Sequence, residues 1–415
     1  MMTDFRPPTM QSPEVSLRRL GLGLFLVSIG KSSVQSAVVG VLVAAKLNFI
    51  SGKSDRISLV ALIAVVSGIA SLFAAVFSGN LSDRTRSRWG MRSPWIVGGG
   101  IVCTLALLAM AVAQSVFMLL VATSVVMMAF SAQLVATTAV IPDRVPEARR
   151  GSLNAVLGVG QLIGLALGLI ISSPFIGNPG KGALCIAVVP ALAGLIFVMA
   201  AREPSNKDVP RLPADTAAVL KSLLPPIGAP DFYWAVSARF FIVLGTAMLL
   251  SYQLYIVTDY LRQDQAGAAM TLSRSAVAYV AGAIIGGALG GPISDRFRRR
   301  KPLTYLSSFL IGASILLLPG WAEPWAMIGY KAVNGFGYGI YLAVHGALAT
   351  EVLPNPKTRG KDLGFLTVAN TLGGIFAPML TAMAVGLGGY PAMFELAAFL
   401  CVGSALLIVP IRSVR

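Results

Sequence analysis

Long apolar segments separated by short polar ones run along almost the whole chain. No Asp, Glu, Lys, Arg or His occurs from Trp95 to Pro142, and the segment Ile57–Leu81 is also uncharged. A helix needs roughly 20 apolar residues to cross a bilayer. The pattern therefore predicts an all-α membrane protein whose twelve transmembrane helices cover residues 20–45, 57–80, 95–113, 117–141, 151–173, 182–201, 232–260, 273–293, 303–319, 325–350, 363–386 and 391–410.

The composition of the 415 residues supports a membrane protein. Hydrophobic residues make up 56% of the chain and charged residues 12%, about half of the ~25% charged residues that soluble domains carry. Soluble globular and disordered chains are therefore excluded. Cys103, Cys185 and Cys401 all fall within apolar spans and form no CxxC pair, so they are expected to be buried small hydrophobic side chains. No metal site and no cofactor are predicted.

A proline-containing segment with mixed charge separates the sixth predicted span from the seventh. Residues 202–230 contain six prolines, which is typical of a linker. We therefore expect an N-terminal six-helix bundle at 1–201, a linker at 202–230 and a C-terminal six-helix bundle at 231–415.

Basic residues collect on one side of the predicted spans. The termini, the linker and the loops on the same side hold 24 of the 33 Lys and Arg residues, and the opposite side holds 6. Since basic loops stay cytoplasmic, both termini and the linker are predicted to be cytoplasmic. Topology thus accounts for most of the net charge of +16, and no nucleic-acid partner is expected.

The two predicted bundles contain an internal repeat. Asp83-Arg84 after the second span and Asp295-Arg296 after the eighth are separated by an offset of 212 residues, and the same offset relates Pro142 to Pro354. Two six-helix units in the same orientation imply a pseudo-two-fold axis along the membrane normal. A binding site is then expected between the units, near the middle of the membrane.

The loop that follows the second span has a specific pattern of charges, glycines and proline. It begins Gly79-Asn-Leu-Ser-Asp83-Arg84 and continues through Arg88 and Gly90 to Pro94-Trp95. In this pattern the chain resembles the major facilitator superfamily, and Gly291–Lys301 resembles the second copy of the same motif. The longer form of the loop is similar to that of the glycoside–pentoside–hexuronide:cation symporters and the sucrose transporters.

The resemblance implies the fold of that superfamily and a gating role for the charged loop residues. In the superfamily the motif latches the two halves together in one state, which assigns gating to a set of six residues: Asp83, Arg84, Arg88, Arg92, Asp295 and Arg296. The alternative is that the arginines only anchor the topology. Sodium symporters of this branch place acidic residues in the second helix, and this chain has none there. Gly160, Gly164 and Gly168 have the spacing of simple helix packing.

Polar side chains inside the spans are the candidates for substrate binding, because polar and ionisable groups are rare in hydrocarbon. The resemblance implies that helices 1, 4, 7 and 10 line a central cavity. Lys331, Asn334, Tyr338, Tyr341 and His345 form one helical row, for which a polar seam between helices is the alternative. The other candidates are Lys31, Gln35, Gln133, Thr137, Tyr252, Gln253 and Tyr255.

Three groups are candidates for ion coupling: Asp259, His345 and Glu395. An imidazole titrates near neutral pH, which suits proton coupling. Lys31, Arg239 and Lys331 outnumber the deep acidic groups, so an anionic substrate is favoured over a cationic one if these cations meet in the cavity.

These features favour a secondary transporter that works by alternating access. The expected partners are a small sugar-like or acidic solute, a proton and the lipid bilayer, and the chain is expected to act as a monomer in the plasma (inner) membrane. The absence of a GxxxxGK[ST] motif excludes an ATPase on this chain. An efflux permease for a metabolite or antibiotic is the close alternative. An intramembrane enzyme is disfavoured by the single His and the few buried acids, and a non-transporting sensor by the lack of a soluble domain.

Overall fold

The computed structural model describes residues 16–52, 55–207, 229–297, 300–351 and 359–411, and nearly all of them are helical. The first part of the chain forms α1 (Leu17–Ala37), η1 (Val38–Leu42), α2 (Val43–Ile50), α3 (Arg56–Arg84), α4 (Ser93–Val112), α5 (Val116–Arg144), α6 (Glu147–Ser172), η2 (Ser173–Phe175), α7 (Pro179–Ala187) and α8 (Val189–Ala201). The second part forms α10 (Pro230–Leu250), α11 (Gln253–Tyr255), η3 (Ile256–Tyr260), α12 (Gln265–Phe297), α13 (Arg300–Ile315), α14 (Leu317–Gly320), α15 (Pro324–Glu351) and α16 (Arg359–Leu406).

The predicted all-α membrane fold is confirmed, and every predicted span overlaps helical structure. Among the described residues, ten helices are long and apolar enough to cross a membrane. The span predicted at 325–350, which falls in α15, is not among these ten, and the last two predicted spans fall together in α16. Within α16 the backbone leaves the helical region at Gly388 and Gly389, where Gly389 has φ 70°. The count of twelve and the cytoplasmic termini stay predictions.

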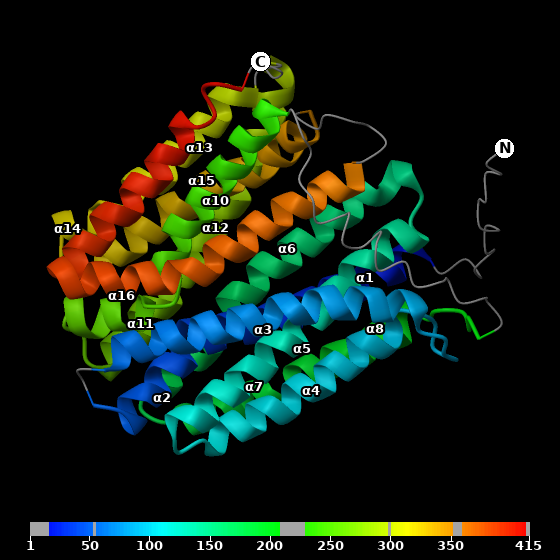
Figure 1. Cartoon of the computed structure of the whole chain (residues 1–415), viewed down its shortest axis with the longest axis horizontal. Helices are drawn as coiled ribbons and strands as arrows, with labels where there is room; N and C mark the ends of the chain where they lie inside the picture. Colours follow the sequence, from blue (N-terminus) through cyan, green and yellow to red (C-terminus); the bar gives the residue numbers. More distant parts are fainter. Residues whose placement is uncertain (1–15, 53–54, 208–228, 298–299, 352–358, 412–415) are drawn as a thin grey trace.

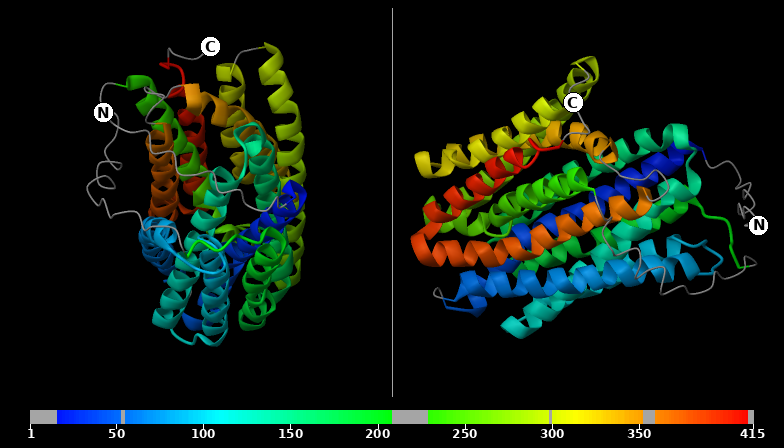
Figure 2. Two further views of the ribbon diagram at one scale, coloured as in Figure 1. Left: turned by 90° about the vertical axis from the view of Figure 1, so that its right-hand side faces the viewer. Right: turned by 45° about the horizontal axis from the view of Figure 1, so that its top comes forward.

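The helices form two groups, one before and one after residues 202–230 (Figures 1 and 2). In the first group α1 packs on α6, and α5 packs on α3 and α4. In the second group α10 packs on α16, and α15 packs on α12 and α13. The second set of pairs corresponds to the first under the sequence repeat. The contacts between the two groups are also related by the sequence repeat: α3 contacts α16, and the corresponding helices α12 and α6 contact each other.

Glycines hold the tightest helix pairs together. A Cβ atom at Gly160 would lie 2.8 Å from the Phe25 carbonyl oxygen, and one at Gly164 would lie 2.5 Å from the Ile29 carbonyl oxygen. The glycine row of α6 therefore lies directly against the backbone of α1, which confirms the predicted packing role. Glycines on both α12 and α15 make the seam between these two helices equally close.

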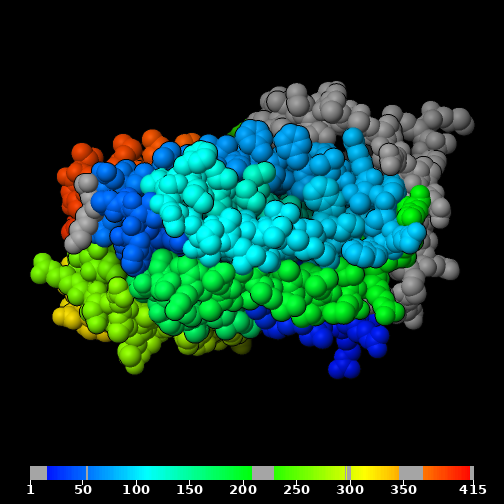
Figure 3. All heavy atoms as spheres, turned by 90° about the horizontal axis from the view of Figure 1, so that it is seen from below, coloured from blue at the N-terminus to red at the C-terminus, as the bar shows by residue number. Residues whose placement is uncertain are grey.

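Large apolar side chains cover much of the outside of the molecule. Phe73, Phe77, Phe117 and Phe399 are each more than half exposed, as expected for surfaces that face lipid. Figure 3 shows one such face, covered by the blue-to-green helices of the first group, with segments of the second group beside them at its left edge.

The cysteines only partly follow the sequence prediction. Cys103 and Cys401 are buried, as expected, and all three thiols are free. The prediction was wrong for Cys185, which is exposed, because the face of α7 that carries it is not covered by another helix.

Candidate functional site

A cavity of about 380 Å³ lies between the two groups of helices. Side chains from α1 and α6 of the first group and from α10, α12, α15 and α16 of the second line it. Its volume falls in the range of small-molecule sites, ~300–1,000 Å³. The position between the repeated units is the one predicted from the sequence repeat.

Three tyrosines form a continuous row in the wall of this cavity. The rings of Tyr279 and Tyr338 have centroids 6.1 Å apart, and those of Tyr338 and Tyr341 stack at 6.4 Å. The Lys331 ammonium lies 5.7 Å from the centroid of Tyr279, and the Arg239 guanidinium lies 6.0 Å from that of Tyr341. A cation therefore stands at each end of an aromatic surface.

Amide side chains complete the polar part of the lining. Arg239 donates from Nε to Oδ1 of Asn370 at 2.7 Å, which fixes the direction of the guanidinium. Asn334 contacts the Ser314 hydroxyl at 3.5 Å. Gln35 from α1 and Gln161 from α6 line the cavity from the first group.

The structure brings five of the predicted binding residues together in this cavity: Gln35, Lys331, Asn334, Tyr338 and Tyr341. Tyr279 and Tyr330 also line it and were not predicted. Tyr279 lies on α12, the eighth predicted span, which the family resemblance does not assign to the cavity. The sequence does contain one indication: Tyr279 is an aromatic residue in a span that is otherwise rich in alanine and glycine.

Other predicted binding residues of the first group lie outside the cavity lining. Lys31 is 4% exposed and its ammonium lies 5.8 Å from the centroid of the Phe130 ring. Gln133 donates from Nε2 to the carbonyl oxygens of Ile96 at 2.9 Å and Pro190 at 3.4 Å, which ties α5 to α4 and α8. The Thr137 hydroxyl donates to the Gln133 carbonyl of its own helix at 2.6 Å.

The predicted binding residues of the seventh span contact the first group of helices. These contacts lie at the end of the molecule opposite the two termini, which we call the far end. The Tyr252 hydroxyl donates to the Ile57 carbonyl at 2.9 Å, and that of Tyr255 donates to the Ala44 carbonyl at 3.0 Å. Gln253 is completely buried, and a side chain at Gly40 of η1 would collide with its Nε2. Neither polar atom of the Gln253 amide has a hydrogen-bond partner among the described residues.

An ion pair joins the two groups at the same end. Arg56 at the start of α3 contacts Oδ2 of Asp259 at 2.5 Å, with only 16% and 23% of the two side chains exposed. The Tyr390 hydroxyl donates to Asp259 at 3.2 Å, and the Arg56 guanidinium lies 4.8 Å from the centroid of Tyr255. We call these contacts, together with those of Tyr252 and Gln253, the far-end closure.

The other two candidate coupling residues lie apart from this closure. Glu395 is exposed on α16. His345 lies in α15, but its side chain is outside the part of the chain that the structure describes. Neither is among the described residues that line the cavity.

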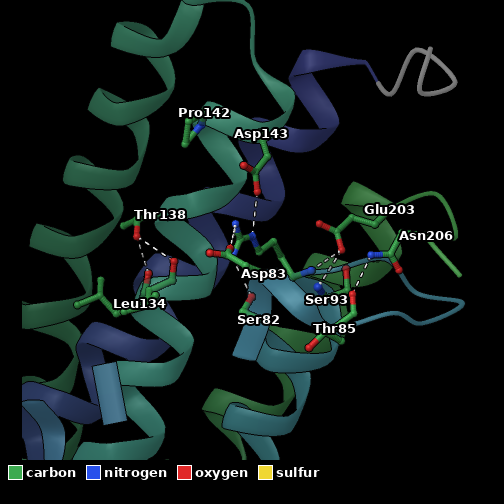
Figure 4. Close-up of polar contacts among 12 residues, drawn as sticks. Ser82, Asp83, Thr85, Ser93, Leu134, Thr138, Pro142, Asp143, Glu203 and Asn206 are labelled. Carbon is green, nitrogen blue, oxygen red and sulfur yellow. Dashed lines mark hydrogen bonds and ion pairs between the residues drawn. The ribbon is translucent and has the colours of Figure 1, made fainter. Parts of the chain in front are cut away.

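At the opposite end, two of the predicted gating residues, Asp83 and Arg92, contact each other, and Figure 4 shows Asp83 beside Ser82 and Asp143. Arg92 pairs with Asp83 at 2.7 Å and with Asp143 at 2.8 Å, and it donates to the Ser82 hydroxyl at 2.9 Å. These contacts tie the ends of α3 and α5 to the start of α4, all within the first group. Arg84 is half-buried, Arg88 and Arg296 are exposed, and the Asp295 side chain lies outside the described part.

A carboxylate that the sequence analysis did not single out completes this network. Oε2 of Glu203 accepts hydrogen bonds from the backbone N–H groups of Arg92 and Ser93, each at 2.9 Å. An anion is favoured there because the helix dipole is positive at the N-terminus of α4. The start of the predicted linker is therefore fixed to the motif loop.

Comparisons with known proteins agree with this architecture. The family model of the Major Facilitator Superfamily matches residues 20–267 and 235–415. The structure is similar to a crystal structure of a D-xylose-proton symporter, with a TM-score of 0.72, 16% identity and coverage of 95% of this chain and 98% of that one.

Two related proteins are named for different transport roles, one as a permease and the other as an efflux protein. The lactose permease of Lactobacillus delbrueckii subsp. bulgaricus is 29% identical over 46% of this chain, a match that spans 34% of the permease. The fujikurins efflux protein of Gibberella fujikuroi is 25% identical over 77% of this chain and 68% of its own length.

The resemblance predicted from the loop motifs is confirmed, because the family model covers nearly the whole chain. The chain belongs to the major facilitator superfamily, a family of multi-pass membrane transporters, and is a multi-pass protein of the plasma membrane.

Proposed function

We propose that this protein is a secondary active transporter that carries a small organic solute, sugar-like or acidic, across the plasma membrane by alternating access. The proposed architecture is twelve spans in two bundles, at 1–201 and 231–415, with cytoplasmic termini. The transporter acts as a monomer and couples transport to protons.

One observation carries the proposal: a cavity shared by both groups of helices lies beside contacts between the groups at the far end. Such contacts can form in one state and break in another, which is the bistable element that alternating access requires. With cytoplasmic termini, the far-end closure faces outward, and the cavity belongs to an inward-facing state.

The proposed coupling to protons depends on titratable side chains, of which Asp259 and His345 are the main candidates. Asp259 exchanges partners when the far-end closure opens, because Arg56 lies on the other group. Protonation of Asp259 removes its attraction to Arg56, so a proton and the open far end favour each other. His345 is the second candidate, because imidazole titrates near neutral pH.

The test is transport into proteoliposomes that contain the purified protein. Radiolabelled sugars, sugar acids and organic acids are supplied with and without an inwardly acidic or outwardly acidic pH gradient. We expect saturable flux that a pH gradient drives uphill. Equal uptake in protein-free vesicles for every solute would refute the proposal.

Export is the second candidate direction, supported by the similarity to a protein named for efflux. The same vesicles separate the two directions. Uphill movement of solute against the direction of the proton flow indicates antiport and export, and movement with it indicates import.

A further inference from the structure

Two positive charges in the central cavity lack an acidic partner. Lys331 is 8% exposed, and its ammonium lies against the rings of Tyr279 and Tyr330, with centroids at 5.7 and 5.4 Å. No described carboxylate lies within ion-pair distance of Lys331 or Arg239, and no Asp or Glu occurs among the described residues of the cavity lining. The hydrogen-bond partner of Arg239 at Asn370 is neutral.

An unpaired ammonium at this depth raises the free energy of the empty site. A buried charge is stable only when it is paired or hydrated. A carboxylate that enters the cavity supplies the missing partner, whereas a neutral solute leaves the ammonium unpaired and a cation adds repulsion.

The remainder of the lining is largely apolar. Leu165, Leu169, Ile242, Val243 and Leu250 face the cavity together with the tyrosine rings. A sugar carries a hydroxyl on almost every carbon and needs a dense set of donors and acceptors, because each unmatched buried hydroxyl is costly. A flat or apolar ring instead gains from contact with the row formed by Tyr279, Tyr338 and Tyr341.

The two cations are also too far apart to hold one small carboxylate together. Lys331 and Tyr341 are ten residues apart on α15, or about 15 Å along the helix, and Arg239 stands at the Tyr341 end. Arg239 therefore lies at the end of the tyrosine row nearer the termini, and Lys331 lies at the other end.

We propose that the substrate is an amphipathic carboxylic acid, whose carboxylate pairs with Lys331 and whose apolar or aromatic ring lies on the tyrosine row. This inference rests on the proposed function and names its substrate class. The proposed substrate class differs from the sugars for which the similar lactose permease and D-xylose-proton symporter are named.

Binding to the purified full-length protein tests the proposal with matched probes. The probes are 4-hydroxybenzoate, phenylacetate and cyclohexanecarboxylate, each compared with its uncharged amide, and glucuronate, glucose and lactose. A charge-assisted hydrogen bond favours the charged ligand by about tenfold to hundredfold. We expect at least one ring acid to bind more tightly than its amide by that factor and more tightly than every sugar.

Variants assign the preference to the cavity cations. K331M is expected to abolish the preference for acid over amide. K331R keeps the positive charge and is expected to retain most of the preference, so the pair distinguishes loss of the charge from a general effect of substitution on folding. R274Q, which removes an exposed arginine on α12 outside the cavity lining, serves as the matched control and should leave the preference unchanged.

The outcomes distinguish this inference from the proposed function. Tight binding and flux of lactose or glucose, with no ring acid preferred over its amide, overturn the substrate class and leave the transporter intact. A ring-acid preference that persists in K331M overturns the role of Lys331. Lack of saturable flux for every probe, acids and sugars alike, counts against the proposed function itself.

Discussion

At the residue scale, Asp259 is the acidic partner in the far-end closure. Its carboxylate accepts from Arg56 on the other group and from Tyr390 on its own. The pair is shielded enough from water that salt screening is weak, and its loss leaves Arg56 without a carboxylate partner.

We therefore predict that D259N shifts the equilibrium away from the state with a closed far end. A hydrogen-bonded charge contact contributes about 1–3 kcal/mol, so the ratio of the two states changes roughly fivefold to hundredfold. The shift is measured by distances between spin labels at Leu81 and Trp234, both exposed near the terminus-side ends of α3 and α10.

E323Q is the matched control, because Glu323 is an exposed acid near the same end of the molecule. An unchanged distance distribution in D259N, equal to that of E323Q, would show that the ion pair does not hold the closure.

Gln133 illustrates the difference between a polar residue that binds solute and one that supports the fold. Its amide connects backbone carbonyls of α4 and α8. We predict that Q133L lowers the free energy of unfolding by about 1–3 kcal/mol and leaves solute affinity unchanged. Thermal unfolding in detergent measures the first and equilibrium binding the second.

The exposed Gln114 provides the comparison, since Q114L removes the same chemical group from the surface and is expected to change stability little. If Q133L instead weakened binding at unchanged stability, Gln133 would be part of the binding site.

The residue scale is also where sequence reasoning is least complete. The row Lys331, Asn334, Tyr338 and Tyr341 could be predicted because helical spacing alone places these residues on one face. Gln133 and Thr137 have the same polar character, but the carbonyls that satisfy them belong to helices distant in sequence or to their own backbone. Tyr279 was missed because its neighbours in the row come from α15, a contact that no local pattern records.

At the element scale, the glycine face of α6 determines how closely α1 can approach. A Cβ at Gly164 would lie 2.5 Å from the Ile29 carbonyl oxygen, whereas one at Gly158 would meet nothing within 4 Å. Both residues lie on α6, so they form a matched pair that differs in helix contact alone.

We predict that G164A destabilises the protein by about 1–3 kcal/mol through overpacking, while G158A is neutral or slightly stabilising, because alanine favours helix. Melting temperatures of the two purified variants check this. Similar temperatures for both would mean that α1 and α6 can separate at little cost.

The helix boundaries show what the pattern of apolar residues can and cannot give. Span positions agree with the helices because a bilayer-length apolar run has one stable backbone solution. The break between α10 and α11 and the π-helical segments η1 and η3 have no signature in hydropathy. At these positions Gln253 and Tyr255 contact η1 and α2 of the other group, which lies far away in sequence.

At the scale of the whole molecule, the far-end closure should open during each transport cycle. We predict that a short bifunctional thiol reagent applied to R56C/D259C blocks flux, because it holds the two groups together. The exposed Cys185 is first replaced by serine, and the buried Cys103 and Cys401 remain.

The single variants R56C and D259C, treated with the same reagent, control for loss of the ion pair and for simple labelling. Flux that continues in the cross-linked double variant would mean that this end does not need to open, and alternating access between these two groups would be excluded.

The interlocked glycine seams have a mechanical consequence. Helices whose backbones touch cannot slide past one another, so each group is expected to tilt as a stiff body. When the contacts of the far-end closure part, the terminus-side ends of the two bodies then approach each other. The effect of a substitution at Arg56 is therefore also expected at the distant end, where no residue has been changed.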